Sequence, residues 1–78
     1  MISPILEAIG DEVRRARSVH SGLNSPHEAT AVIREEYLEA EREVFAKHCD
    51  RKSLHEELVQ LAAMCVRAIE DLGLVCSP

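Results

Sequence analysis

A group of oxygen-bearing side chains at helical spacing occupies the middle of the chain. Glu35, Glu36 and Glu39 lie in one stretch, and Glu57 and Gln60 lie in a later one. Residues three or four apart on a helix have neighbouring side chains, so each stretch brings its oxygen atoms together. Carboxylate oxygens are ligands that Mg²⁺ prefers, and this ion keeps several waters whose places substrate phosphates can take. The pattern therefore predicts a hard-cation site, with Mg²⁺ or Mn²⁺ as the cofactor.

Helix-start signals predict the first two elements that position these residues. A Ser-Pro pair at residues 3–4 places a capping residue before a proline suited to the first helical position, and apolar spacing continues to about Val19. A second Ser-Pro pair at residues 25–26 repeats the signal, and Glu28 completes a capping box. We expect the second helix to continue from there to about His48.

A third helix follows a turn that we expect at residues 49–52. Ser53 and Glu56 form another capping box at its start, and apolar spacing continues to Leu72. Gly73 suits the left-handed position that commonly ends a helix.

Two antiparallel helices joined at this turn bring the two polar stretches together. Glu39 lies ten residues before residue 49 and Gln60 lies seven after residue 53, so their depths differ by about one helical turn. The oxygen-bearing groups expected to converge between the two helices are Glu36, Glu39, Glu57 and Gln60.

Length and composition bound the class of protein. A chain of 78 residues allows one small domain over residues 1–78, and 46% apolar residues are too many for a disordered acidic tail. The formal net charge of −5 argues against a general nucleic-acid binder. No apolar run is long enough to span a bilayer, and Glu7, Asp11 and Glu12 interrupt any signal-peptide core. We therefore expect a cytoplasmic all-α domain with no nucleic-acid or membrane partner, built as a helical hairpin plus N-terminal helix and fraying over residues 74–78.

Apolar residues on the second helix form two separate faces. One face holds Ala29, Ile33, Ala40 and Val44, and the other holds Ala31, Leu38 and Phe45. The third helix adds an apolar face of Leu54, Leu58, Leu61, Ala62, Cys65, Ile69 and Leu72. Two faces on one helix need two packing partners, which a bundle shared between chains supplies more easily than one small chain. We therefore expect self-association.

Cysteine and histidine give a weaker metal signal. The three cysteines are far apart and odd in number, which argues against a disulfide framework. His48, Cys49 and His55 cluster at the second turn, but these loosely spaced ligands lack the fourth that a structural zinc site needs.

The two acidic stretches resemble a family signature. Residues 35–39 (Glu-Glu-Tyr-Leu-Glu) followed by residues 57–60 (Glu-Leu-Val-Gln) are similar to the EExxE…ExxD signature of MazG-like nucleotide pyrophosphohydrolases, in the all-α NTP pyrophosphatase superfamily. The apolar stretch that follows resembles the helix after ExxD, so the resemblance covers about residues 24–74. Gln60 departs from the pattern, because an amide replaces the final acid and brings no charge to a cation. Many relatives also continue with a further helix, which makes a partner subunit more necessary.

The resemblance implies a helical bundle that assembles as a homodimer or homotetramer. Its expected activity is hydrolysis of a (deoxy)nucleoside triphosphate to the monophosphate and pyrophosphate, in nucleotide-pool house-cleaning. The residues implied to hold Mg²⁺ are Glu36, Glu39, Glu57 and Gln60, and either the metal or a carboxylate such as Glu35 would activate the attacking water. Arg17 and His27 are weaker candidates for contact with the substrate phosphates, and pairing with an acid is the favoured alternative for Arg17.

A non-catalytic helical module is the alternative function. The same two-faced helix suits oligomerisation or partner binding, and an acidic stripe is usually a solvated helix face, as expected for Glu28, Glu41 and Glu43. An enzyme needs its acidic ligands convergent and accessible, whereas a scaffold tolerates their replacement.

Overall fold

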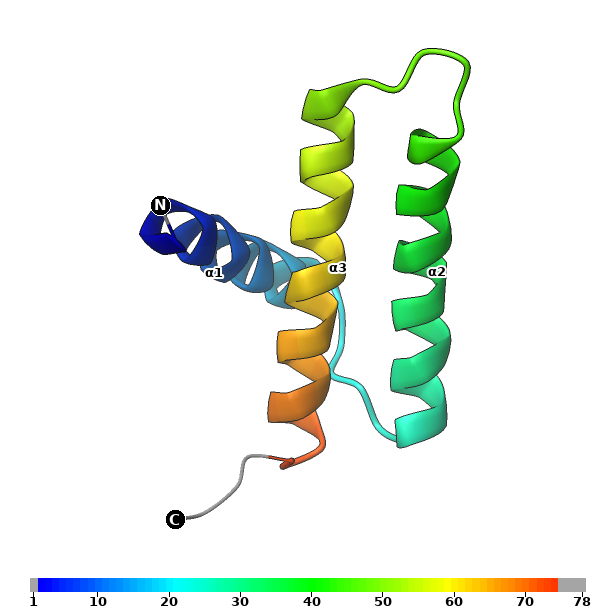
Figure 1. Ribbon diagram of the computed structural model, residues 1–78. Helices are drawn as coiled ribbons and strands as arrows, with labels where there is room; N and C mark the ends of the chain where they lie inside the picture. The colour runs from blue at the N-terminus through cyan, green and yellow to red at the C-terminus, as the bar shows by residue number, and fades with distance from the viewer. Residues whose placement is uncertain (1, 75–78) are drawn as a thin grey trace.

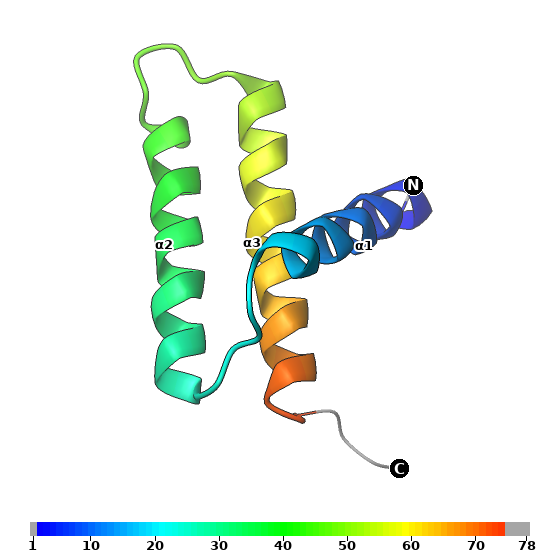
Figure 2. The same cartoon turned by 180° about the vertical axis from the view of Figure 1, so that it is seen from behind.

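Three α-helices make up the chain in the computed structural model, which describes residues 2–74. Helices α2 (Pro26–Val44) and α3 (Arg51–Asp71) form an antiparallel hairpin, and α1 (Ile2–Val19) crosses α3 on one face of the hairpin, with its N-terminal end extending away from α2 (Figures 1 and 2). Helix α1 packs on α3, and over the described residues it makes no close backbone contact with α2. That part of the chain contains no strand and no helix with the length and apolar character needed to cross a membrane. The prediction of an all-α hairpin plus N-terminal helix is confirmed.

The start of α2 follows the sequence signal closely. Ser25 is the N-cap, and its hydroxyl accepts a hydrogen bond of 3.1 Å from the backbone N–H of Glu28. Pro26 occupies the first turn, where its missing N–H is not needed. The Glu28 carboxylate accepts from the N–H of Asn24 at 3.2 Å, one residue before the position a standard capping box uses.

Three of the predicted helix ends are wrong. Helix α1 begins at Ile2, so Ser3 lies inside the helix instead of capping it. Helix α2 ends at Val44, with Phe45 as its C-cap, and does not reach His48. Phe45 is 81% exposed and the side chains that follow it up to residue 50 are also exposed, so no packing energy extends the helix past Val44.

The start of α3 is the third correction. The helix begins at Arg51 with Asp50 as its N-cap, two residues before the predicted start at Ser53. The Asp50 carboxylate accepts from the N–H of Lys52 at 3.1 Å and from the Ser53 hydroxyl at 2.9 Å. A carboxylate also interacts favourably with the positive end of the helix dipole, so Asp50 caps the helix and the Ser53 hydroxyl acts as a donor to it.

The end of α3 confirms the role predicted for Gly73. The helix ends at Asp71, and Gly73 has a positive φ of 65°. The N–H of Gly73 donates to the carbonyl of Glu70 at 3.2 Å, and the N–H of Leu74 donates to the carbonyl of Ile69 at 2.9 Å. This pair of bonds is a Schellman motif, whose left-handed residue is usually glycine. The fraying predicted over residues 74–78 does not hold for Leu74, which makes one of these bonds, and residues 75–78 lie outside the described residues.

Small side chains dominate the core. The buried alanines are Ala16 of α1, Ala29 and Ala40 of α2, and Ala63 and Ala68 of α3. Leu23, from the connection between α1 and α2, joins Met64 in a cluster with two of these alanines. Alanine lets helices approach closely, but each one buries little apolar area. A single chain therefore leaves much of its larger apolar surface uncovered.

The apolar face predicted for the third helix is only partly covered. Leu58 is 50% exposed, Ile69 is 45% exposed and Cys65 is also exposed, and we call these three residues the α3 stripe. The buried side chains of α3 are instead Ala63, Met64, Arg67 and Ala68. On α2, Ala29 and Ala40 of the first face are buried, but Val44 at the end of that face is exposed, as is Phe45 of the second face.

Candidate metal centre

Three carboxylates converge between α2 and α3. Glu36 and Glu39 project from α2 and Glu57 projects from α3, and one oxygen of each lies within 4.8 Å of the other two. Two oxygens bound to one Mg²⁺ lie about 3–4 Å apart, because each Mg–O distance is about 2.1 Å. A small contraction of the cluster is enough to reach that spacing. The carboxylates that the sequence predicted to converge are therefore brought together, and we call them the acidic cluster.

Two oxygens of the acidic cluster are withdrawn from water. Within residues 2–74, Glu36 Oε2 and Glu57 Oε2 are buried without a hydrogen-bond partner. Partial burial raises the pKa of Glu36 above its ordinary value, and the charges of Glu39 and Glu57 raise it further. Partial burial and the adjacent Glu39 carboxylate raise the pKa of Glu57 in the same way. The ionised cluster is thus electrostatically unfavourable by itself, and a bound cation would relieve both the repulsion and the missing contacts.

A pocket of about 340 Å³ adjoins this cluster, with walls from all three helices. Glu36 lines it together with Glu35 and Gln60, two residues assigned to the site from the sequence. Glu35 is exposed and Gln60 is half-buried. Their shared pocket places an exposed carboxylate and a side-chain amide beside Glu36 of the acidic cluster.

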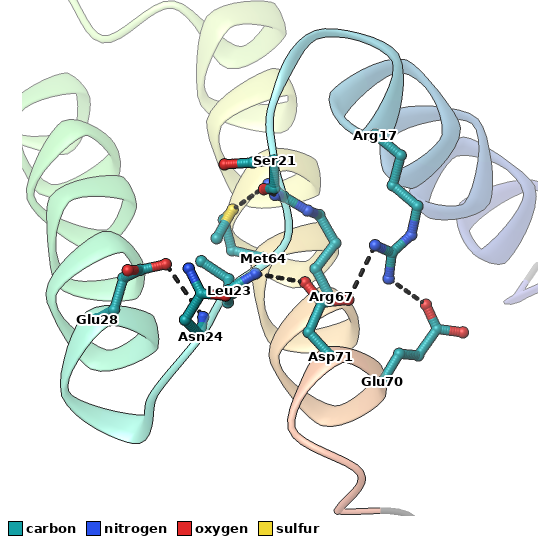
Figure 3. A network of polar contacts seen from close by, with 9 residues as sticks. All are labelled: Arg17, Ser21, Leu23, Asn24, Glu28, Met64, Arg67, Glu70 and Asp71. Carbon is teal, nitrogen blue, oxygen red and sulfur yellow. Dashed lines mark hydrogen bonds and ion pairs between the residues drawn. The ribbon is translucent and has the colours of Figure 1, made fainter.

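Arg17 has the alternative role considered for it, pairing with acidic residues. Its guanidinium donates to Glu70 at 2.7 Å and to Asp71 at 2.9 Å (Figure 3). These hydrogen bonds raise the pKa of Arg17 and hold α1 against the last turn of α3. Arg17 does not line the pocket beside the acidic cluster.

The histidine candidates lie elsewhere. His27 is exposed in the first turn of α2 and is also absent from the lining of this pocket. Among the residues described, His48, Cys49 and His55 do not form a group with ligand atoms close enough for one metal ion.

Arg67 is a residue of this pocket that the sequence reasoning missed. Its side chain is 3% exposed and lines the pocket from α3. A signal was present in the sequence, because residues 57, 60, 64, 67 and 71 follow one helix face at spacings of three and four. All of them are polar except Met64. The candidate residues predicted on this face end at Gln60.

Comparisons with known proteins assign neither a family nor a function to this chain. No protein-family model matches the chain, and neither the curated proteins nor the solved structures give a match. The residue pattern and the site geometry are therefore what support a functional proposal.

Proposed function

We propose that this protein is a Mg²⁺-dependent nucleoside triphosphate pyrophosphohydrolase of the MazG-like type, acting in the cytoplasm on the nucleotide pool. The observation that carries this proposal is the convergence of Glu36, Glu39 and Glu57, two of whose carboxylate oxygens are buried without a partner in the described part of the chain. These residues are three of the four acidic members of the EExxE…ExxD pattern in this chain, and Glu35 is the fourth. Their oxygen-only chemistry fits a hard cation.

Each residue has a distinct role in the proposed reaction. Glu36, Glu39 and Glu57 would hold the cation, and Gln60 would add a neutral oxygen ligand at the edge of the same pocket. Bound Mg²⁺ would supply charge neutralisation for the phosphate groups. Glu35 is exposed and lines the pocket, so its carboxylate can accept a proton from a water that attacks the α-phosphorus and releases pyrophosphate.

Assembly into a homodimer or homotetramer belongs to the same proposal. The α3 stripe and the second face of α2 expose large apolar side chains, including Leu58, Ile69 and Phe45. Contiguous exposed apolar surface commonly marks an interface. A second copy of the chain would cover these faces and complete a bundle of the MazG-like type.

A pyrophosphate-release screen tests the proposed activity. Purified protein is incubated with each common ribonucleoside and deoxyribonucleoside triphosphate, with Mg²⁺ and separately with Mn²⁺. We expect pyrophosphate and the matching monophosphate from at least one substrate, with no release in EDTA. Glu36→Gln and Glu57→Gln should each lower the rate at least about 100-fold, because each removes a ligand charge.

A matched control separates the site from general charge effects. Glu7 is an exposed carboxylate of α1 that lines none of the pockets described. Glu7→Gln should keep the wild-type rate. A protein that releases no pyrophosphate from any substrate and binds neither cation would support the non-catalytic helical module instead.

A further inference from the structure

Arg67 is a buried cation with incomplete hydrogen bonding. Its side chain is 3% exposed, and its Nη2 donates to the carbonyl of Ser21 at 3.1 Å (Figure 3). Its Nη1 donates to the Met64 sulfur at 3.2 Å, and a thioether is a weak acceptor. Over residues 2–74 its Nε has no partner. A guanidinium has five N–H donors, so a buried one with these partners leaves much of its donor capacity unused.

Asp71, one turn further along α3, does not complete these contacts. Asp71 is close enough for the charge of Arg67 to contribute to its lowered pKa. Its carboxylate, however, is engaged by the N–H of Leu23 at 2.8 Å and by Arg17. A buried charge is costly unless it is paired and hydrogen-bonded, so this arrangement is unusual for a purely structural arginine.

Arg67 shares the pocket of about 340 Å³ with Glu36 and Gln60. Arg15 also lines this pocket, but it donates to Glu12 at 2.9 and 2.5 Å, so its charge is already matched. One wall of the pocket therefore carries Glu36 of the acidic cluster, and another carries Arg67, whose Nε has no partner among the described residues. An anion alone would be repelled by the carboxylates around it, whereas an anion that carries a divalent cation would meet complementary charge on both walls.

We propose that Arg67 is the oxyanion-recognising residue of this pocket, and that its ligand is a pyrophosphate-type anion bridging to a divalent cation in the acidic cluster. This inference rests on the proposed cation site and assigns it a phosphate-binding residue. A planar guanidinium fork suits two phosphate oxygens, which a lysine at the same place would not match. Arg67 thus has the role for which Arg17 and His27 were considered.

Calorimetric titration tests the inference with magnesium pyrophosphate as the probe. We expect the wild-type protein to bind preformed magnesium pyrophosphate at least about tenfold more tightly than pyrophosphate in EDTA, since the cation and the anion favour each other's binding. Arg67→Lys and Arg67→Gln should weaken binding of magnesium pyrophosphate by about 10- to 100-fold, as expected for loss of charge-assisted hydrogen bonds. Arg14, an exposed arginine paired with Asp11, is the matched control, and Arg14→Gln should bind like the wild type.

Two measurements keep the inference separate from other effects. Mn²⁺ binding without pyrophosphate should be the same in wild type and in Arg67→Lys, because Arg67 is not a cation ligand. If the wild type binds no Mn²⁺, the proposed function fails. If it binds Mn²⁺ but magnesium pyrophosphate binds equally well to both proteins, only the role of Arg67 fails.

The wild-type protein also gives a readout that needs no stable variant. The buried Nε–H of Arg67 should give a distinct NMR resonance in the arginine side-chain region, and Arg67→Lys identifies it if that variant folds. We expect this resonance to shift on addition of magnesium pyrophosphate. Arginine Nε–H resonances that all stay in place at saturating ligand would overturn the inference.

Discussion

The carboxylate of Asp71 accepts a 2.8 Å hydrogen bond from the backbone N–H of Leu23, 48 residues earlier in the chain (Figure 3). Leu23 is itself buried in the connection between α1 and α2, where it packs in the core cluster. The same carboxylate accepts from Arg17 at 2.9 Å. One side chain at the end of α3 therefore holds both the end of α1 and the loop that follows it.

Removing this carboxylate should destabilise the fold measurably. Asp71→Ala leaves the N–H of Leu23 without an acceptor and Arg17 with one fewer, so we expect a loss of about 1–3 kcal/mol in the free energy of unfolding. Urea denaturation monitored by circular dichroism measures it. Asp11→Ala, which breaks the exposed Arg14 pair, should cost less than about 0.5 kcal/mol. Equal effects in the two variants would show that Asp71 has no special anchoring role.

The acidic cluster should make the metal-free protein more stable as the pH falls from neutral toward 4.5, the ordinary pKa of glutamate. The pKa values of Glu36 and Glu57 are raised in the folded protein, so over this range the folded state binds more protons than the unfolded chain. Glu57→Gln should flatten this rise, because it removes one titrating group and part of the repulsion. Thermal unfolding across pH in EDTA measures the effect, and identical profiles for the two proteins would contradict it.

The lowered pKa of Asp71 should act in the opposite direction at lower pH. The bond from Leu23, followed by that from Arg17, holds this pKa below its ordinary value of 3.8. The stability that Asp71 contributes is present above 3.8 and is lost as the pH falls through the folded-state value. Below pH 3.8, the free energy of unfolding should fall more steeply with decreasing pH in the wild type than in Asp71→Asn. Parallel curves for the two proteins over this pH range would rule out this contribution.

Restoring the acid at position 60 should change cation binding and metal-free stability together. Gln60→Asp and the longer Gln60→Glu each add a negative charge beside Glu36. We expect Mg²⁺ to bind about tenfold more tightly and the metal-free melting temperature to fall by about 4–8 °C, equivalent to about 1 kcal/mol. Calorimetry and thermal unfolding in EDTA measure the two effects. If neither variant changes either quantity, residue 60 points away from the acidic cluster.

Charge placed in the α3 stripe should abolish self-association. The double variant Leu58→Lys, Ile69→Lys puts two cations where a second copy would pack, so we expect monomers by light scattering. The melting temperature should then lose its dependence on protein concentration. Val19, a 62% exposed apolar residue at the end of α1, is the control, and Val19→Lys should leave assembly unchanged. A wild-type protein that is monomeric and stably folded at micromolar concentration would exclude the proposed assembly.

Local signals in the sequence were enough to predict the three helices and the convergence of the acidic residues between two of them. Ser25 and Gly73 act where their chemistry predicts, and antiparallel pairing brings Glu57 to the residues of α2 that were expected to face it. The N-cap of α3 was harder to predict, because Asp50 and Ser53 are both of residue types that cap helices well. The conformation of the loop before α3 decides which of the two accepts hydrogen bonds from the first N–H groups of the helix. The placement of Arg67 depends on where α1 and its loop lie, which helical periodicity within α3 does not specify.

The packing of α1 against α3 affects how readily this helix detaches from the rest of the chain. Ala16 is its one buried residue, and over the described residues the backbone of α1 comes close to that of α3 but not to that of α2. Its amides should therefore exchange with solvent faster than those of the hairpin, since the helix can detach while α2 and α3 stay paired. Glu12, Arg15 and Ala16 of α1 line the pocket beside the acidic cluster. Detachment of α1 would thus remove one wall of this pocket and leave Arg67 more accessible to a ligand.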